Sequence, residues 1–219
     1  MARLKLKRFR VKPPAPEVLA HYVRVYDPRE LYHHPDSVLP ITSESLFGND
    51  HPLVLDLGCG RGEFLVAQAE DHRDLNFLGF DWHVKSLWAA TQAAHQAELD
   101  NVRLIQVDFR LALPAMPAGS ACEVFMLFPQ PVFQHNRTSE DPLLESTLRQ
   151  VQRVLAPEGW FHFVTDHAEY FEIKRALIEQ SGLFTVSNES QAYEGGITWF
   201  QRFWETRQIE SRRLACRKV

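Results

Sequence analysis

The sequence predicts an α/β protein with a Rossmann-like, doubly wound, mostly parallel sheet of seven strands. Strand and helix patterns alternate from residue 53 onward, and this alternation is typical of a parallel sheet that helices cover on both faces. A glycine-rich turn follows the first apolar strand, and an aspartate lies in or just after each of the first three strands. In such sheets ligands bind at the carboxyl ends of the strands, so we expect the functional site there.

Each element is predicted from its apolar pattern and from the residues that end it. Strands are short apolar or alternating runs between turn residues, and we expect them over 53–57, 76–81, 102–108, 123–128 and 160–165, with two more between 183 and about 206. Helices repeat apolar residues three or four positions apart, and we expect them over 62–70, 84–98, 142–155 and 168–180. A turn is expected at residues 157–159, and the aromatic residues of the strand that follows it are expected in the core, namely Trp160, Phe161 and Phe163.

Residues 1–50 are expected to form an arm that precedes the domain of residues 51–219. Prolines occur in this stretch at positions 13, 14, 16, 28, 35 and 40. Such spacing favours an extended segment that crosses the domain or stays mobile.

Charge is distributed unevenly along a chain whose net charge is −4. Residues 1–12 hold six basic residues and no acid, which leaves −10 on the rest of the chain. The C-terminus is basic again at Arg212, Arg213, Arg217 and Lys218. Basic tails of this kind either stay solvated or hold phosphates while the acidic body repels them.

Several classes of protein are disfavoured by what the sequence lacks. No apolar run approaches the ~18 residues of a membrane helix, and the basic N-terminus lacks the apolar core of a signal peptide. The histidines show no metal-ligand spacing, and the three cysteines are too far apart for a Cys-x-x-Cys zinc site, at Cys59, Cys122 and Cys216. We therefore expect a cytoplasmic protein with no bound metal and no membrane partner.

The turn after the first strand has the spacing Gly-x-Gly-x-Gly, formed by Gly58, Gly60 and Gly62. Glycine lets the backbone turn sharply and lets a ligand lie against the main chain, and the next helix directs its free N–H groups at that ligand. Dinucleotide-binding proteins have Gly-x-Gly-x-x-Gly instead. The spacing therefore favours S-adenosylmethionine over NAD.

Acids near the ends of the first three strands complete the predicted cofactor site. Asp81 lies 25 residues after Asp56, the position at which such domains place an acid for the ribose hydroxyls. Asp108, near the end of the third strand, is expected to accept from the adenine amino group while Phe109 covers the ring. Trp82 is included in the same predicted site.

Beyond these features, the chain resembles the bacterial tRNA (guanine-N7-)-methyltransferases, which are class I S-adenosylmethionine-dependent enzymes. The likeness covers roughly residues 50–205 and includes the glycine turn and four further segments, namely 78–81, 101–104, 127–131 and 155–160. Its most particular part is Thr165-Asp166-His167-Ala168-Glu169-Tyr170-Phe171, which is similar to the family's Thr-Asp-x-x-Glu-Tyr-Phe. The resemblance implies a target-base pocket lined by Gln130, Asp166, Thr198 and Gln201.

Four departures from the family pattern fall at that pocket. Gln130 replaces an aspartate and Val132 a tryptophan, and the basic cluster that follows is thinned to residues 134–137. Gln201 replaces a glutamate in the family's Thr-Lys-Phe-Glu.

Transfer of a methyl group to guanine N7 in tRNA is the function that the resemblance implies. The tRNA is expected to contact the basic termini and the loop of residues 128–137, and the protein is expected to be a monomer or homodimer. The departures leave two alternatives open. One is a methyltransferase of the same fold that acts on another nucleobase or a small molecule, and the other is a non-catalytic relative that binds RNA or a protein partner.

Overall fold

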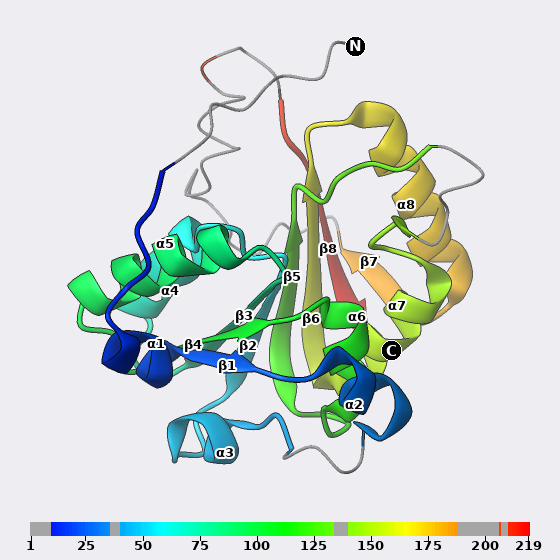
Figure 1. Ribbon diagram of the computed structural model, residues 1–219. Coiled ribbons are helices and arrows are strands. Elements are labelled where there is room, and N and C mark those ends of the chain that lie inside the picture. The colour runs from blue at the N-terminus through cyan, green and yellow to red at the C-terminus, as the bar shows by residue number, and fades with distance from the viewer. Residues whose placement is uncertain (1–9, 36–39, 134–139, 188–205, 207–209) are drawn as a thin grey trace.

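The computed structural model describes residues 10–35, 40–133, 140–187, 206 and 210–219. Its centre is an eight-stranded sheet with the order β1-β4-β3-β2-β5-β6-β8-β7 (Figure 1). The strands are β1 (Val23–Val25), β2 (Leu53–Leu57), β3 (Asn76–Asp81), β4 (Val102–Gln106), β5 (Ala121–Leu127), β6 (Leu155–Thr165), β7 (Phe184–Ser187) and β8 (Arg212–Lys218). The helices are α1 (Pro16–Tyr22), α2 (Pro28–His33), α3 (Ser43–Phe47), α4 (Glu63–Asp71), α5 (Val84–Gln96), α6 (Phe109–Ala112), α7 (Glu145–Val154) and α8 (Ala168–Ser181), with a 3₁₀ turn η2 at Leu113–Ala115.

The predicted mostly parallel, doubly wound sheet is confirmed, with eight strands rather than seven. The strands from β1 to β6 pair in parallel, whereas β8 is antiparallel to both β6 and β7. The strand order reverses between β2 and β5. In open α/β sheets this point of reversal creates a crevice beyond the carboxyl ends of the strands, where ligands bind.

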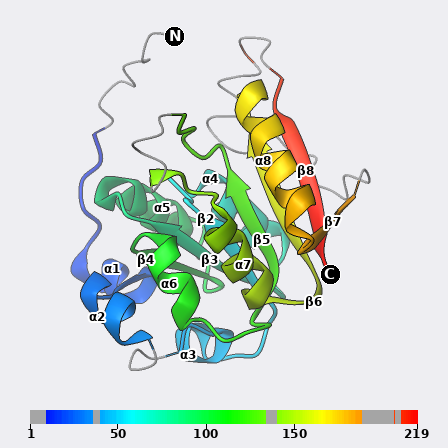
Figure 2. The ribbon, with the colours of Figure 1, turned by 90° about the vertical axis from the view of Figure 1, so that its right-hand side faces the viewer.

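Two hydrophobic cores, one on each face of the sheet, hold the layers together. Alternate residues of a strand point to opposite faces, so Leu78 and Phe80 of β3 join one core while Phe77 joins the other. α1, α4 and α5 contribute to the core on the Phe77 side. The opposite core includes residues from α2, α3, α6, α7 and α8, and Figure 2 shows α7 and α8 lying along the β5–β6–β8 half of the sheet. Phe161 and Phe163 are fully buried, as expected, and Trp160 is half-buried. Among the described residues, no helix is long and apolar enough to cross a membrane.

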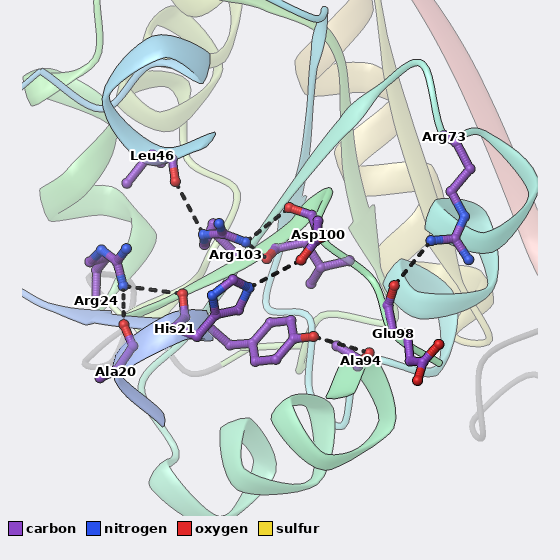
Figure 3. Close-up of polar contacts among 11 residues, drawn as sticks. Ala20, His21, Arg24, Leu46, Arg73, Ala94, Glu98, Asp100 and Arg103 are labelled. Carbon is purple, nitrogen blue, oxygen red and sulfur yellow. Dashed lines mark hydrogen bonds and ion pairs between the residues drawn. The ribbon is translucent and has the colours of Figure 1, made fainter. Parts of the chain in front are cut away.

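The prediction that residues 1–50 are irregular is wrong for most of their described part. α1, α2 and α3 form there, and β1 pairs with β4 at the edge of the sheet. Polar contacts fasten this layer to the sheet (Figure 3): His21 Nε2 lies 3.5 Å from Asp100 Oδ1, and Arg103 Nε donates to Leu46 O at 3.1 Å. Runs of only three to seven residues explain why the periodicity did not reveal these elements.

The basic C-terminus is not a free tail, because it forms β8. Leu214, Ala215 and Cys216 are buried in the sheet. Arg212 pairs with Glu172 and Arg217 with Glu158, both of which are acids of the fold. Of the two strands expected between 183 and 206, the first is β7, and the second falls on residues 188–205, which lie outside the described residues; β8 was not predicted.

Three predicted boundaries also differ from the structure. The third strand ends at Gln106 rather than Asp108, and the helix expected over 142–155 is confined to Glu145–Val154. The turn expected at 157–159 is part of β6, where Glu158 takes a left-handed φ of 66° opposite a register shift in β5. An irregularity of this kind lets a strand continue through residues typical of turns.

Candidate active site

The glycine turn between β2 and α4 is bonded to the end of β3. The N–H groups of Gly58 and Cys59 both donate to Phe80 O at 2.9 Å. Gly62, which precedes α4, has a φ of 75°, and a Cβ there would lie 2.7 Å from the Cβ of Ala90. Only glycine combines this left-handed backbone with so close an approach to α5. The turn is therefore fixed between β3 and α5.

Asp81 is positioned by the same turn at the end of β3. Its Oδ2 accepts from Gly60 N at 3.0 Å and its Oδ1 from His83 N at 2.7 Å. Burial raises the pKa of this carboxyl, while the hydrogen bonds from the backbone of His83 and Gly60 act in the opposite direction. The carboxylate is thus held at a strand end by backbone donors, and its remaining lone pairs are suited to ribose hydroxyls.

Asp56 lies in β2 and is only 2% exposed. Its Oδ1 has no hydrogen-bond partner in the described part of the chain. Burial, reinforced by the charges of Asp81 and Glu63, raises its pKa to about 8. An uncompensated buried carboxyl is costly, and a cationic ligand placed near the turn would offset that cost.

Asp108 is engaged more fully than expected. It caps α6, with Oδ1 accepting from Arg110 N at 3.0 Å, and the Arg110 guanidinium donates to both carboxylate oxygens, with Nη2–Oδ2 at 2.6 Å. This hydrogen bonding raises the pKa of Arg110. Asp108 can therefore accept from an adenine amino group only through carboxylate lone pairs that Arg110 does not occupy.

A cavity of about 700 Å³ lies where the strands β2 to β5 end. That volume falls within the range of cofactor and small-molecule sites. The cavity brings together six of the residues predicted to form the site, namely Gly58, Asp81, Trp82, Asp108, Phe109 and Gln130. Trp82 is 76% exposed, so a large aromatic surface lies open beside Asp81. Gly60 and Gly62 support the turn, and neither they nor Asp56 line the cavity.

The predicted base pocket is only partly assembled in the described residues. Gln130 is exposed and lines the cavity, whereas Asp166, in the segment between β6 and α8, does not line it. Thr198 and Gln201 lie outside the described residues. The loop that carries Gln130 begins at Phe128, which has a φ of 52° and donates its N–H to Val164 O at 2.7 Å. A left-handed backbone at a bulky residue is costly and often marks a functional site.

Sequence reasoning missed several cavity residues, notably Phe133 and Glu140. Both flank residues 134–139 in the long connection between β5 and α7. Phe133 lies within the loop of residues 128–137 that was expected to contact tRNA, but nothing in the sequence singled it out from that loop. Glu140 was not singled out either, because a lone glutamate in a polar stretch is usually a surface residue.

Comparisons with known proteins identify a family model and relatives that match most of the chain. A family model described as "Putative methyltransferase" matches residues 50–209. The chain is 33% identical to a tRNA (guanine-N(7)-)-methyltransferase of Chloroherpeton thalassium, with 94% of this chain and 93% of the relative covered. It is 34% identical to the enzyme of the same name from Rubrobacter xylanophilus, with 94% and 95% covered.

Solved structures show the same fold at lower identity. The 16S rRNA methyltransferase KamB superposes with a TM-score of 0.59 at 16% identity, covering 80% of this chain and 92% of that one. The aminoglycoside resistance methyltransferase NpmB1 gives 0.56 at 19% identity, covering 84% and 97%. These likenesses support the class I methyltransferase architecture. The family model and the sequence relatives show that the chain belongs to the bacterial tRNA (guanine-N7-)-methyltransferase family.

Proposed function

We propose that this protein transfers a methyl group from S-adenosylmethionine to N7 of a guanosine in tRNA. The observation that carries the proposal is one cavity shared by the cofactor-type strand ends, Gly58 and Asp81, and the family-specific loop containing Gln130. The relatives named for this reaction align over nearly the whole chain. With tRNA as substrate, the expected location is the cytoplasm.

The residues around the glycine turn fit an adenosyl cofactor. Asp81 would accept from the ribose hydroxyls, and the exposed ring of Trp82 and the half-buried ring of Phe109 would pack against the adenine. The buried Asp56 carboxyl, whose Oδ1 has no partner in the described residues, would be easier to ionise with the positively charged cofactor nearby, because an opposite charge lowers a carboxyl pKa. When bound, S-adenosylmethionine supplies an electrophilic methyl group on a sulfonium.

The loop after β5 would orient the base. Guanine N7 has an in-plane lone pair and no proton, so its methylation needs no general base, and the rate depends on how well N7 is positioned in a dry pocket. The Gln130 amide can accept from a guanine N–H through its oxygen and donate through its nitrogen. Relative to the family's acid it loses charge assistance, at a cost of about 1–3 kcal/mol for two such substitutions. Glu140 provides a carboxylate in the same cavity.

The N-terminal segment would supply part of the phosphate contacts. Arg10 and Lys12 are exposed, and the segment lies beside α5, where Gln92 Nε2 donates to Lys12 O at 3.0 Å (Figure 1). The C-terminal basic residues contribute less than the sequence suggests, since Arg212 and Arg217 pair with acids of the fold. Binding should therefore weaken with salt, with a slope set by a small number of phosphate contacts.

The test combines the purified protein, radiolabelled S-adenosylmethionine and bulk tRNA from a bacterial strain that lacks 7-methylguanosine. We expect label in tRNA and strand scission at the modified site after borohydride and aniline treatment. Asp81→Asn, which removes charge from the proposed ribose contact, should lower cofactor affinity by about tenfold and should leave the site of methylation unchanged. Label on another nucleobase, or on small molecules of a metabolite extract alone, would favour the first alternative. No cofactor binding by calorimetry would favour the non-catalytic one.

A further inference from the structure

Phe133 is an aromatic residue on the cavity for which the cofactor has no evident use. It follows the Phe128–Val132 stretch of the loop, lines the cavity and is 45% exposed. Its ring is nonetheless held on one side, with its centroid 4.8 Å from that of His167 and 6.1 Å from that of Tyr170, at 79° to the latter. Phe133 is thus an apolar surface that is partly open and partly supported by the first turn of α8.

That support is rigid, because Tyr170 is fixed by a buried polar network. The Tyr170 hydroxyl donates to Asp141 Oδ1 at 2.8 Å, and Lys174 Nζ donates to Asp141 Oδ2 at 2.5 Å. Asp141 Oδ1 also accepts from Leu143 N at 3.1 Å, and Lys174 Nζ donates to Leu143 O at 2.8 Å. Asp141, Tyr170 and Lys174 are each at most 5% exposed. Satisfied buried networks of this kind favour a single arrangement.

The network also links the two described parts of the connection between β5 and α7, both of which contribute residues to the cavity. Asp141 follows Glu140, and Tyr170 supports Phe133, so one set of bonds fixes both sides of residues 134–139. His167 completes the support, because its Nδ1 accepts from Tyr170 N at 3.3 Å at the start of α8. An aromatic ring held in this way loses little conformational entropy when a planar ligand packs on it.

We propose that Phe133 is the stacking surface for the target guanine, and that the Asp141–Tyr170–Lys174 network positions it. The inference rests on the proposed function and deepens it. Every nucleobase has a flat π-face that packs on an aromatic side chain, and Gln130 lines the same cavity with the polar group needed at the base edge.

The experiment compares steady-state methylation of tRNA lacking 7-methylguanosine by the wild type and by Phe133→Leu, Phe133→Trp and Tyr32→Leu. Tyr32 is a matched control, since it is an aromatic residue that is 70% exposed and lies outside the cavity lining. Phe133→Leu should lower kcat/KM for tRNA on the order of 10- to 100-fold, whereas Phe133→Trp should stay within about threefold of the wild type and Tyr32→Leu should be unchanged. Affinity for S-adenosylhomocysteine, measured by calorimetry, should stay the same in all four proteins.

Two outcomes would overturn the inference while leaving the proposed function intact. One is tRNA methylation by Phe133→Leu at the wild-type rate. The other is a loss of tRNA methylation in both Phe133→Leu and Phe133→Trp that is accompanied by weaker S-adenosylhomocysteine binding, which would assign Phe133 to the cofactor. A wild-type protein that binds S-adenosylhomocysteine but forms no 7-methylguanosine in tRNA would overturn the proposed function, and this inference with it.

Discussion

Replacing Asp56 with asparagine tests whether this buried acid, which lies in β2 just before the glycine turn, lowers the stability of the fold. In the folded protein the pKa of Asp56 is raised to about 8, compared with about 3.9 in an unfolded chain. Between these values the native state binds the proton and the unfolded state does not, so the free energy of unfolding falls as pH rises. Asp56→Asn has no proton to bind at this position and should lack that part of the pH dependence.

The magnitude follows from the size of the shift. Each pKa unit corresponds to about 1.4 kcal/mol, so the wild type should lose up to about 3 kcal/mol relative to Asp56→Asn between pH 5 and pH 7.5. The buried amide costs about 1–3 kcal/mol wherever its new donors lack partners, but that cost is the same at both pH values. The difference between the two pH values therefore isolates the titration of Asp56.

Urea unfolding of both proteins at pH 5, 6, 7 and 7.5 provides the measurement. The curves of unfolding free energy against pH should diverge, with the wild type falling faster. Parallel curves would refute the reasoning, because Asp56 would then titrate near its ordinary value in the fold. A buried acid such as Asp56 lowers the stability of the folded protein. Such a cost is expected where function requires the acid.

Two further substitutions test the supports of the site. Gly62→Ala should destabilise the protein by about 2–4 kcal/mol, because the new Cβ would lie 2.7 Å from the Cβ of Ala90 in α5 and the backbone there is left-handed. Gly182→Ala is the matched control, since its φ is also left-handed at 66° but no atom lies within 4 Å of the new Cβ. Thermal melts should show a smaller loss for this control, about 1–2 kcal/mol. Equal losses would contradict the close-approach argument. Lys174→Met should cost about 3–5 kcal/mol in urea unfolding, since it leaves the Asp141 carboxylate buried without its cation; a cost below about 1 kcal/mol would show that Asp141 finds another partner.

The meeting of Gly58, Asp81 and Asp108 could be predicted from the sequence because the carboxyl ends of parallel strands lie at one edge of the sheet. The spacing of Asp56, Asp81 and the glycines fixed which strand ends meet, and the cavity contains Gly58, Asp81 and Asp108 as expected. The hydrogen-bond partners of each acid could not be predicted, because they depend on side-chain contacts that the spacing along the sequence does not reveal. The pairing of Asp108 with Arg110, two residues later, is such a contact.

Long-range pairs and short elements were beyond the reach of the pattern. Asp141 and Lys174 are 33 residues apart, and neither belongs to a recognisable motif. β1 has only three residues, too few for an alternating pattern to be distinguished from a loop. β8 was obscured by its charges, since only Leu214, Ala215 and Cys216 of the strand are buried.

A crystal structure with bound S-adenosylhomocysteine would test the central claim most directly. The account predicts the ribose hydroxyls on Asp81, the adenine near Trp82 and Phe109, and the sulfur directed toward the loop that carries Gln130 and Phe133. Density for the ligand outside this cavity, or a ribose that makes no contact with Asp81, would contradict it.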